Sequence, residues 1–444
     1  MPNLPPQSDT SPVPPSPLLA LINPGDDQLV PYAIESEAEL VVPAIPMLSH
    51  LVPPAIEYAT LRTSCVMFDE PHRRVLTVRG NDRVGFLNSM LTQELKDIGD
   101  EGRPNARSSF WLNQKGRIQT DLRAVAIADR IMMTCDAHDA SACARSLDTF
   151  LFAEDVAIQE AHTEWHCFSL HGPASRDLLA EATTNADAAH RVRELDEDHA
   201  IEIDIGSSRV VVDRCDIAGV VGLSLLVPRD HAVDVAEKLL TLGNWQRHEP
   251  MYEANAAIEK HLAHLEDPST KTRIRPIGWY AMNTARIEAG TPIFHVDFGT
   301  TSLPAETSVL NDRVSFTKGC YLGQEVVARM HARGAGKQFV RALKPVEADG
   351  IPIPRDAHNQ YLLSVAGTPL FPMESRNALL RGDIDVGQQH VGTITSATIS
   401  PMLSGLPVAL ATVKWKHAAP GTNLLTIAEG ELVVMQVQEE LRFV

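Results

Sequence analysis

The sequence predicts an α+β protein, with two successive α+β modules followed by an all-β carboxyl-terminal domain. Three observations lead to this prediction. A phrase of strand, glycine, polar turn and helix occurs twice, as VLTVRGNDRVGFLNS (75–89) and as CFSLHGPASRDLLAE (167–181). From Phe339 onward, short β-rich runs are separated by Pro and Gly, which is typical of a small barrel or sandwich. The 444 residues, 44% of them apolar, are enough for about two to four domains.

Residues 1–54 are expected to form a mostly disordered or extended tail, because they hold 13 of the 30 prolines and proline at this density interrupts helices and ladders. Either a simple tether or a docking segment fits this composition. The first Lys or Arg is Arg62, so no basic signal region is present and a cytoplasmic location is expected. No run reaches the roughly 18 apolar residues that a membrane-spanning helix needs, and no membrane partner is expected.

The first module is expected over residues 55–160. RRVLTVRG (73–80) alternates like a half-buried strand, and the following NDRVGFLNSML predicts a helix that Asn81 or Asp82 caps. Residues 116–136 predict two strands joined at Ala128–Arg130. A helix is expected after them, at about 139–151.

The second module is expected over residues 161–338, and the barrel or sandwich over 339–444. A charged, His-rich connector, with a predicted helix at 250–265, interrupts the second module at 244–275. The strands and helices expected on either side of the connector lie at about 201–205, 209–213, 222–227, 230–242 and 276–290, the last one ending at Gly290.

Charge and cysteine content exclude some classes of function. The 39 Lys and Arg residues against 57 Asp and Glu residues give a net charge of −18, which disfavours direct binding of nucleic acid through its phosphates. The six cysteines form no C-x-x-C pair and no zinc-type spacing with histidine. We therefore expect a reducing compartment and no protein-held metal site.

The segment KGCYLGQE (318–325) is the most specific short pattern in the chain. Cys320 is either a small buried apolar residue or a reactive thiol. Gly319 and Gly323 predict backbone turns that other residues avoid. A helix is expected to begin at GQEVVARM, where its free N–H groups favour a nearby thiolate. Lys318 precedes the thiol by two residues.

Four segments in order resemble the YgfZ/GcvT family. KGCYLGQEVVARMHARGAGKQ (318–338) is similar to the signature of the YgfZ branch, and the other three are ARIEAGTPIFHVDFGTTSLPAE (285–306), SLHGP (169–173) and VGTITSATISPMLSGLPVALATV (391–413). The resemblance covers residues 57–444 except much of the connector. It implies a cloverleaf of two ferredoxin-like modules and a carboxyl-terminal β-barrel, with folate in the central hole.

The resemblance implies a function, but the family divides. GcvT members are aminomethyltransferases that work with tetrahydrofolate and a lipoyl carrier protein, whereas YgfZ-like members support maturation or repair of iron–sulfur enzymes, and bacterial ones also affect tRNA thiolation. Because the YgfZ branch carries a cysteine in this motif, we expect a folate-binding accessory protein with Cys320 as its key thiol and iron–sulfur clients or assembly factors as partners. The alternatives are a tetrahydrofolate-dependent aminomethyltransferase and a folate-binding protein without catalysis, so the sequence leaves turnover open.

The resemblance also implies site residues. Glu94, in LTQE (91–94), stands where the transferases have an Asp near the reacting folate nitrogen, and Val220, in AGVVGL (218–223), stands where they have a pterin-binding Glu. The basic side chains suit the glutamate tail of folate. The candidates for catalysis are Cys320, Lys318 and Glu94, and those for folate binding are Arg286, Gln324, Glu325 and Arg329, with Arg333 and Lys337 near them.

Overall fold

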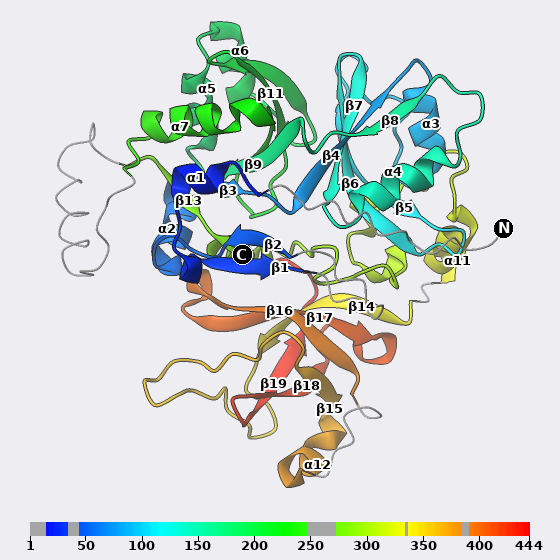
Figure 1. Cartoon of the computed structure of the whole chain (residues 1–444). Coiled ribbons are helices and arrows are strands. Elements are labelled where there is room, and N and C mark those ends of the chain that lie inside the picture. The colour runs from blue at the N-terminus through cyan, green and yellow to red at the C-terminus, as the bar shows by residue number, and fades with distance from the viewer. Residues whose placement is uncertain (1–14, 34–43, 247–271, 334–335, 383–389) are drawn as a thin grey trace.

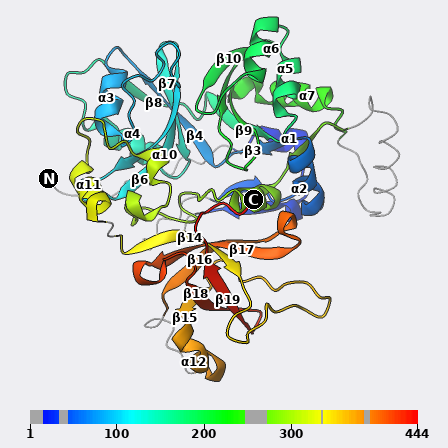
Figure 2. The same cartoon turned by 180° about the vertical axis from the view of Figure 1, so that it is seen from behind.

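The computed structural model describes residues 15–33, 44–246, 272–333, 336–382 and 390–444. Two α/β modules lie side by side above a β-barrel, and a short amino-terminal hairpin lies where the three units meet (Figures 1 and 2). Within the described ranges, no helix has the length and apolar character that crossing a membrane requires.

The first module is a five-stranded antiparallel sheet in the order β5-β6-β7-β4-β8. Its helices α3 and α4 bury Leu87 and Leu147 in one apolar cluster with the sheet residues Leu76 and Ile131. The repeated strand–turn–helix phrase and the joint near Ala128 are confirmed. The elements are β4 (Arg73–Arg79), α3 (Arg83–Met90), β5 (Ala106–Leu112), β6 (Ile118–Ile127), β7 (Arg130–Asp136), α4 (Ala140–Asp148) and β8 (Ala157–Glu160).

The second module is a six-stranded sheet in the order β10-β11-β12-β9-β3-β13. The structure corrects the expected start of the first module at residue 55, because β3 pairs with β9 and β13 of this second sheet. All five residues of β3 are buried, as an inner strand requires. The elements are α2 (Pro54–Thr63), β3 (Cys65–Asp69), β9 (Trp165–His171), α5 (Ser175–Ala182), α6 (Ala186–Arg193), β10 (Ala200–Ile205), β11 (Ser208–Arg214), β12 (Gly222–Pro228), α7 (Ala232–Leu242), β13 (Ile274–Ile277) and α9 (Trp279–Glu288). The helix expected at 250–265 falls outside the described residues.

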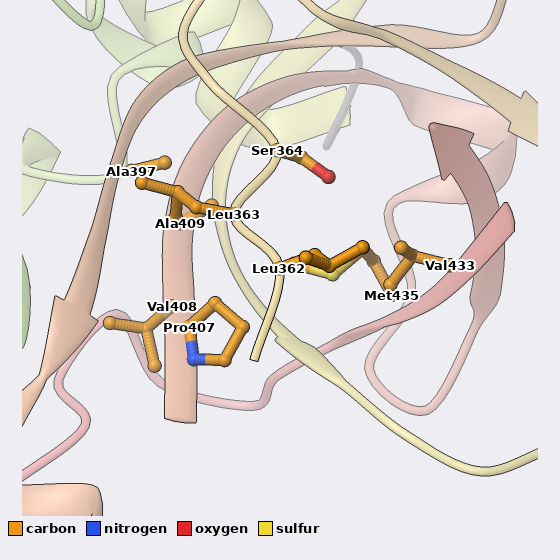
Figure 3. Close-up of a pocket in the computed structure, with 9 residues that line it drawn as sticks. All are labelled: Leu362, Leu363, Ser364, Ala397, Pro407, Val408, Ala409, Val433 and Met435. Carbon is orange, nitrogen blue, oxygen red and sulfur yellow. The ribbon is translucent and has the colours of Figure 1, made fainter. Parts of the chain in front are cut away.

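The carboxyl-terminal domain is a closed barrel in the order β14-β17-β16-β15-β18-β19, so the barrel alternative is confirmed. Figure 3 shows side chains around the small cavity inside it, including Leu362, Val433 and Met435. The cavity volume of about 10 Å³ leaves room for no more than one water. The elements are β14 (Gln338–Pro345), β15 (Pro369–Pro372), α12 (Arg376–Arg381), β16 (Gly392–Ser400), β17 (Leu406–Lys414), β18 (Asn423–Ala428) and β19 (Glu431–Val437).

The segment before the barrel packs on the first module, although it was expected in the second. It contains η3 (Pro304–Glu306), α10 (Leu310–Arg313) and α11 (Gln324–Arg333). Phe298, Tyr321 and Val327 from this segment share one apolar cluster with Phe110 and Leu112 of β5. The KGCYLGQE motif is therefore attached to the first module.

The amino-terminal region corrects the expectation of a disordered or extended tail over 1–54. Residues 15–33 and 44–54 form α1 (Leu18–Ile22), η1 (Asp26–Gln28), β1 (Leu29–Tyr32) and the antiparallel partner β2 (Ile45–Leu48), while 1–14 and 34–43 fall outside the described residues. Leu18 and Ile22 are buried in the core of the second module. Apolar residues between the prolines thus find a surface to bury against, and a two-stranded ladder with free edges tolerates Pro31 and Pro46.

Candidate functional site

The KGCYLGQE loop is anchored to the turn between β5 and β6. Gly323 has a φ of +81°, and a Cβ added there would stand 2.9 Å from the backbone oxygen of Asn113. This position therefore requires glycine, as predicted. Gly319 does not, because its φ is not positive and an added Cβ would meet nothing within 4 Å.

Lys318 is buried at the carboxyl-terminal end of α3. Its Nζ donates to the backbone oxygens of Asn88, Leu91 and Gln93, at 2.5, 2.7 and 2.9 Å. A cation suits the partial negative charge of a helix end. Burial lowers the pKa of Lys318 to about 8, and the charge of Glu94 opposes this shift.

Glu94 lies at the same end of α3, so the structure brings two of the three predicted catalytic residues together. The bend before it, at residues 91–93, is tied to the loop before the motif. Thr92 donates its hydroxyl to the backbone oxygen of Arg313 at 2.6 Å, and Ser315 N–H donates to the backbone oxygen of Thr92 at 3.0 Å. These bonds fix the backbone before Glu94 at the helix end where the Lys318 amine lies.

Cys320 is exposed, whereas four of the other cysteines are buried and Cys215 is half-buried. The alternative of a buried apolar cysteine is therefore wrong. Phe316, four residues before Cys320, stacks on His331 of α11 with ring centroids 4.0 Å apart. The thiol is thus available to solvent or to a partner molecule.

The predicted folate-binding residues are not brought together. Gln324 is half-buried, and Glu325, Arg329 and Lys337 are exposed; the side chain of Arg333 falls outside the described residues. Arg286 is 1% exposed and pairs with Asp297 at 2.5 Å. Its other donors reach Asn283, the backbone oxygen of Thr291 and Ser396, so this placement does not support the prediction that Arg286 binds a ligand.

The space where the modules and the barrel meet is filled by the amino-terminal hairpin, together with a set of residues that we call the central cluster. The central cluster comprises Met47, Tyr58, Leu61, Val66, Phe68, Ala218, Ile277, Ala281, Met282 and Ala285, with Val30, Tyr32, Ile217, Val220 and Trp279 partly buried against it. Val220, expected where transferases recognise the pterin, therefore packs in apolar surroundings that include the hairpin.

A group of polar residues at the end of the hairpin was missed by sequence reasoning. We call Tyr32, His72, Asp136, His138, Asp139 and His295 the His–Asp cluster. The Tyr32 hydroxyl donates to Asp136. His138 Nδ1 lies 3.0 Å from Asp136 Oδ1, and His295 Nε2 lies 2.6 Å from Asp139 Oδ2. The run DAHDA (136–140) after a predicted strand was the one sign of it in the sequence.

Burial and close contacts shift the ionisation of this cluster. Burial alone would raise the pKa of Asp136, but hydrogen bonds from His138 and Tyr32 lower it to about 2. Burial alone would lower the pKa of His295, but the hydrogen bond and charge of Asp139 raise it. Burial lowers the pKa of His72 to about 4. These shifts favour the ionised form of Asp136, the protonated form of His295 and the neutral form of His72.

The His–Asp cluster and the Glu94 loop are joined through two aromatic residues. Phe298, three residues after His295, packs edge-on against Phe110 with ring centroids 6.0 Å apart. Phe110 N–H donates to Thr92 Oγ1 at 2.9 Å. These contacts lead from the turn that carries His295 to Thr92, two residues before Glu94.

The hollow beside α3 is large enough for a small molecule, at about 550 Å³. Its lining includes the carboxylates of Asp82 and Glu154 and no Lys or Arg. A carboxylated ligand such as folate does not suit this charge, so the hollow is not the predicted folate site.

Comparisons with known proteins give one consistent fold. The sequence profile of the family described as GCVT N-terminal domain matches residues 53–265. The aminomethyltransferase of Streptomyces coelicolor is 24% identical over 369 residues, which cover 83% of each chain. The mitochondrial aminomethyltransferase of Dictyostelium discoideum is 22% identical over 392 residues, which cover 86% of this chain and 83% of the relative.

A solved structure supports the same fold over the whole chain. The crystal structure of glycine cleavage system aminomethyltransferase T from Bartonella henselae superposes with a TM-score of 0.71 at 21% identity, covering 98% of each chain. The expected GcvT-like fold, with α/β modules and a closed carboxyl-terminal barrel, is confirmed.

Proposed function

We propose that this protein is a tetrahydrofolate-dependent one-carbon transferase of the aminomethyltransferase type. The observation that carries this proposal is similarity along nearly the whole chain to proteins with that name. One such relative aligns over 83% of both chains, and the solved aminomethyltransferase T covers 98% of this one. This similarity favours the transferase alternative over the accessory role that the motif suggests.

The proposed folate site is the central cluster. Val30, Tyr32 and Met47 of the hairpin pack there against a surface that includes Phe68, Trp279 and Met282. A flat pterin ring has the size and apolar faces to take the place of hairpin side chains on such a surface. Folate and the hairpin then compete, so the hairpin must shift when the ligand binds.

Glu94 is proposed to handle the proton at the reacting folate nitrogen. Glu94 keeps a carboxylate where the transferase pattern has Asp, on a side chain one methylene longer. Lys318, fixed at the same helix end, has a pKa of about 8 because of its burial. It places a positive charge near Glu94 at neutral pH.

A transfer assay with an aminomethylated lipoyl carrier and tetrahydrofolate tests the proposal. The wild-type chain should release the one-carbon unit to folate, and Glu94→Gln should lower the rate by about a hundredfold or more. Cys320→Ser should leave the rate unchanged. No turnover by the wild-type chain with a carrier that a known transferase accepts would contradict the proposal.

The exposed thiol of Cys320 favours a second candidate, an accessory protein for iron–sulfur enzymes. Cys320 is the exposed member of the six cysteines, and it stands in a loop that Gly323 and Tyr321 hold against the first module. For this candidate, unlike the transferase, Cys320→Ser is the damaging variant and Glu94→Gln is not. In cells without the native protein, Cys320→Ser should fail to restore iron–sulfur enzyme activity, while Glu94→Gln and the control Cys215→Ser should restore it. Full rescue by Cys320→Ser would remove this candidate.

A further inference from the structure

The His–Asp cluster brings together three groups that bind metal ions. One oxygen of Asp136, one oxygen of Asp139 and a ring nitrogen of His295 all lie within 4.8 Å of one another. Asp136 ends β7, Asp139 directly precedes α4, and His295 comes from the loop after α9. Neither the spacing of the sequence nor the proposed transfer reaction assigns a role to this combination.

We propose that Asp136, Asp139 and His295 bind a divalent transition-metal ion. Imidazole and carboxylate donors suit Zn²⁺ and its first-row neighbours, whereas Mg²⁺ prefers sites built from oxygen alone. Three protein ligands leave at least one coordination position open. Its three ligands are distinct from Glu94 and Lys318, but Tyr32, which contacts Asp136, also belongs to the proposed folate site, so zinc binding is measured without folate.

Two buried nitrogen atoms within the His–Asp cluster support a ligand there. His138, whose side chain is 3% exposed, contacts Asp136 through Nδ1, and its buried Nε2 has no hydrogen-bond partner among the described residues. The same holds for His72 Nδ1, and the rings of His72 and His138 both lie against Tyr32, with centroids 5.2 and 5.4 Å from its ring. Buried imidazole nitrogens without partners are unfavourable.

The ligands are held by rigid parts of the fold, as a metal site requires. His295 N–H donates to the backbone oxygen of Phe298 at 2.7 Å, which closes a tight turn. Asp297 in this turn is fixed by Arg286 and by Ser396 of the barrel. On the other side, the backbone N–H of His138 donates to Asp136 at 2.8 Å. Tyr32, through its hydroxyl on Asp136, orients that ligand from outside.

Zinc titration of the metal-free full-length chain tests the proposal, with calorimetry as the readout. The wild-type chain should bind one Zn²⁺, with Mg²⁺ unable to compete at equal concentration. His295→Gln keeps a hydrogen-bonding side chain beside Asp139 but removes the ligand, and it should weaken zinc binding at least about tenfold. Asp139→Asn should have a similar effect. Circular dichroism of each variant checks that it is folded.

Two further variants separate this site from other zinc binding. His166→Gln alters another buried His–Asp pair, in which Nε2 lies 2.8 Å from Asp69, and it should leave zinc affinity unchanged. Cys320→Ala should also leave it unchanged. The proposal is overturned if the wild-type chain shows no saturable binding, if His295→Gln binds as tightly as wild type, or if zinc is lost only in Cys320→Ala.

Discussion

Arg286 and Asp297 form an ion pair that is closed to solvent, with Nη1 and Oδ2 2.5 Å apart and side-chain exposures of 1% and 0%. Asp297 also accepts hydrogen bonds from Thr395 and Ser396 of β16, each at 2.7 Å. The pair therefore joins α9, the turn that carries His295 and the barrel. Arg286 was expected to bind a ligand. Its place in this buried pair gives it a structural role instead.

Replacing Arg286 by Met should lower the free energy of unfolding by about 3–5 kcal/mol, because Asp297 is then left buried without its partner charge. Urea unfolding measures this loss. Arg329→Met is the matched control, since Arg329 is exposed, and its effect should be within about 0.5 kcal/mol. Equal stability of the two variants would mean that the pair does not hold the three parts together.

Replacing Gly323 by Ala should destabilise the chain by about 1–3 kcal/mol. The φ of +81° disfavours any Cβ, and the added atom would press on the backbone of the β5–β6 turn. Gly319→Ala, four residues earlier, is the control. It should leave stability unchanged because the space around an added Cβ is open. Thermal unfolding of both variants is the measurement; a neutral Gly323→Ala would argue against the docking of the motif on that turn.

His171 should make stability depend on pH between about 6.5 and 4. Burial lowers the pKa of His171 to about 4, so in this range the unfolded chain binds more protons than the folded one. The contribution is present above pH 6.5, and up to about 3 kcal/mol is lost as pH falls to 4. Urea unfolding as a function of pH should show a shallower fall for His171→Asn than for wild type.

His358→Asn, at an exposed position, is the control and should keep the wild-type pH profile. If His171→Asn also keeps that profile, His171 is not held neutral in the folded chain. The comparison is needed because other groups titrate in the same range.

Local patterns in the sequence were sufficient to predict most of the fold. The repeated phrase at 75–89 and 167–181 gave β4–α3 and β9–α5, since strand and helix periods are read over a few residues. The assignment of β3 to the second sheet was not predictable in this way. Its pairing with β9 joins residues about a hundred positions apart, and the register is set by burial on both faces.

The candidate site was predictable only in part, for a similar reason. The motif made Lys318 and Cys320 candidates, and the family resemblance of LTQE made Glu94 one; their roles stay predictions. Nothing local shows that Asp139 meets His295 across 156 positions, or that Tyr32 from a proline-rich segment reaches Asp136. The sequence also does not distinguish a basic residue that binds a ligand from one that, like Arg286, pairs with a buried acid.

The most direct test of the proposed function is a titration of the full-length chain with tetrahydrofolate, comparing wild type with Tyr32→Ala. The chain should bind one folate, and Tyr32→Ala should bind it at least about tenfold more tightly, because the hairpin side chain no longer competes for the central cluster. Absence of saturable binding in both proteins, or equal affinity in the two, would contradict a folate site beneath the hairpin.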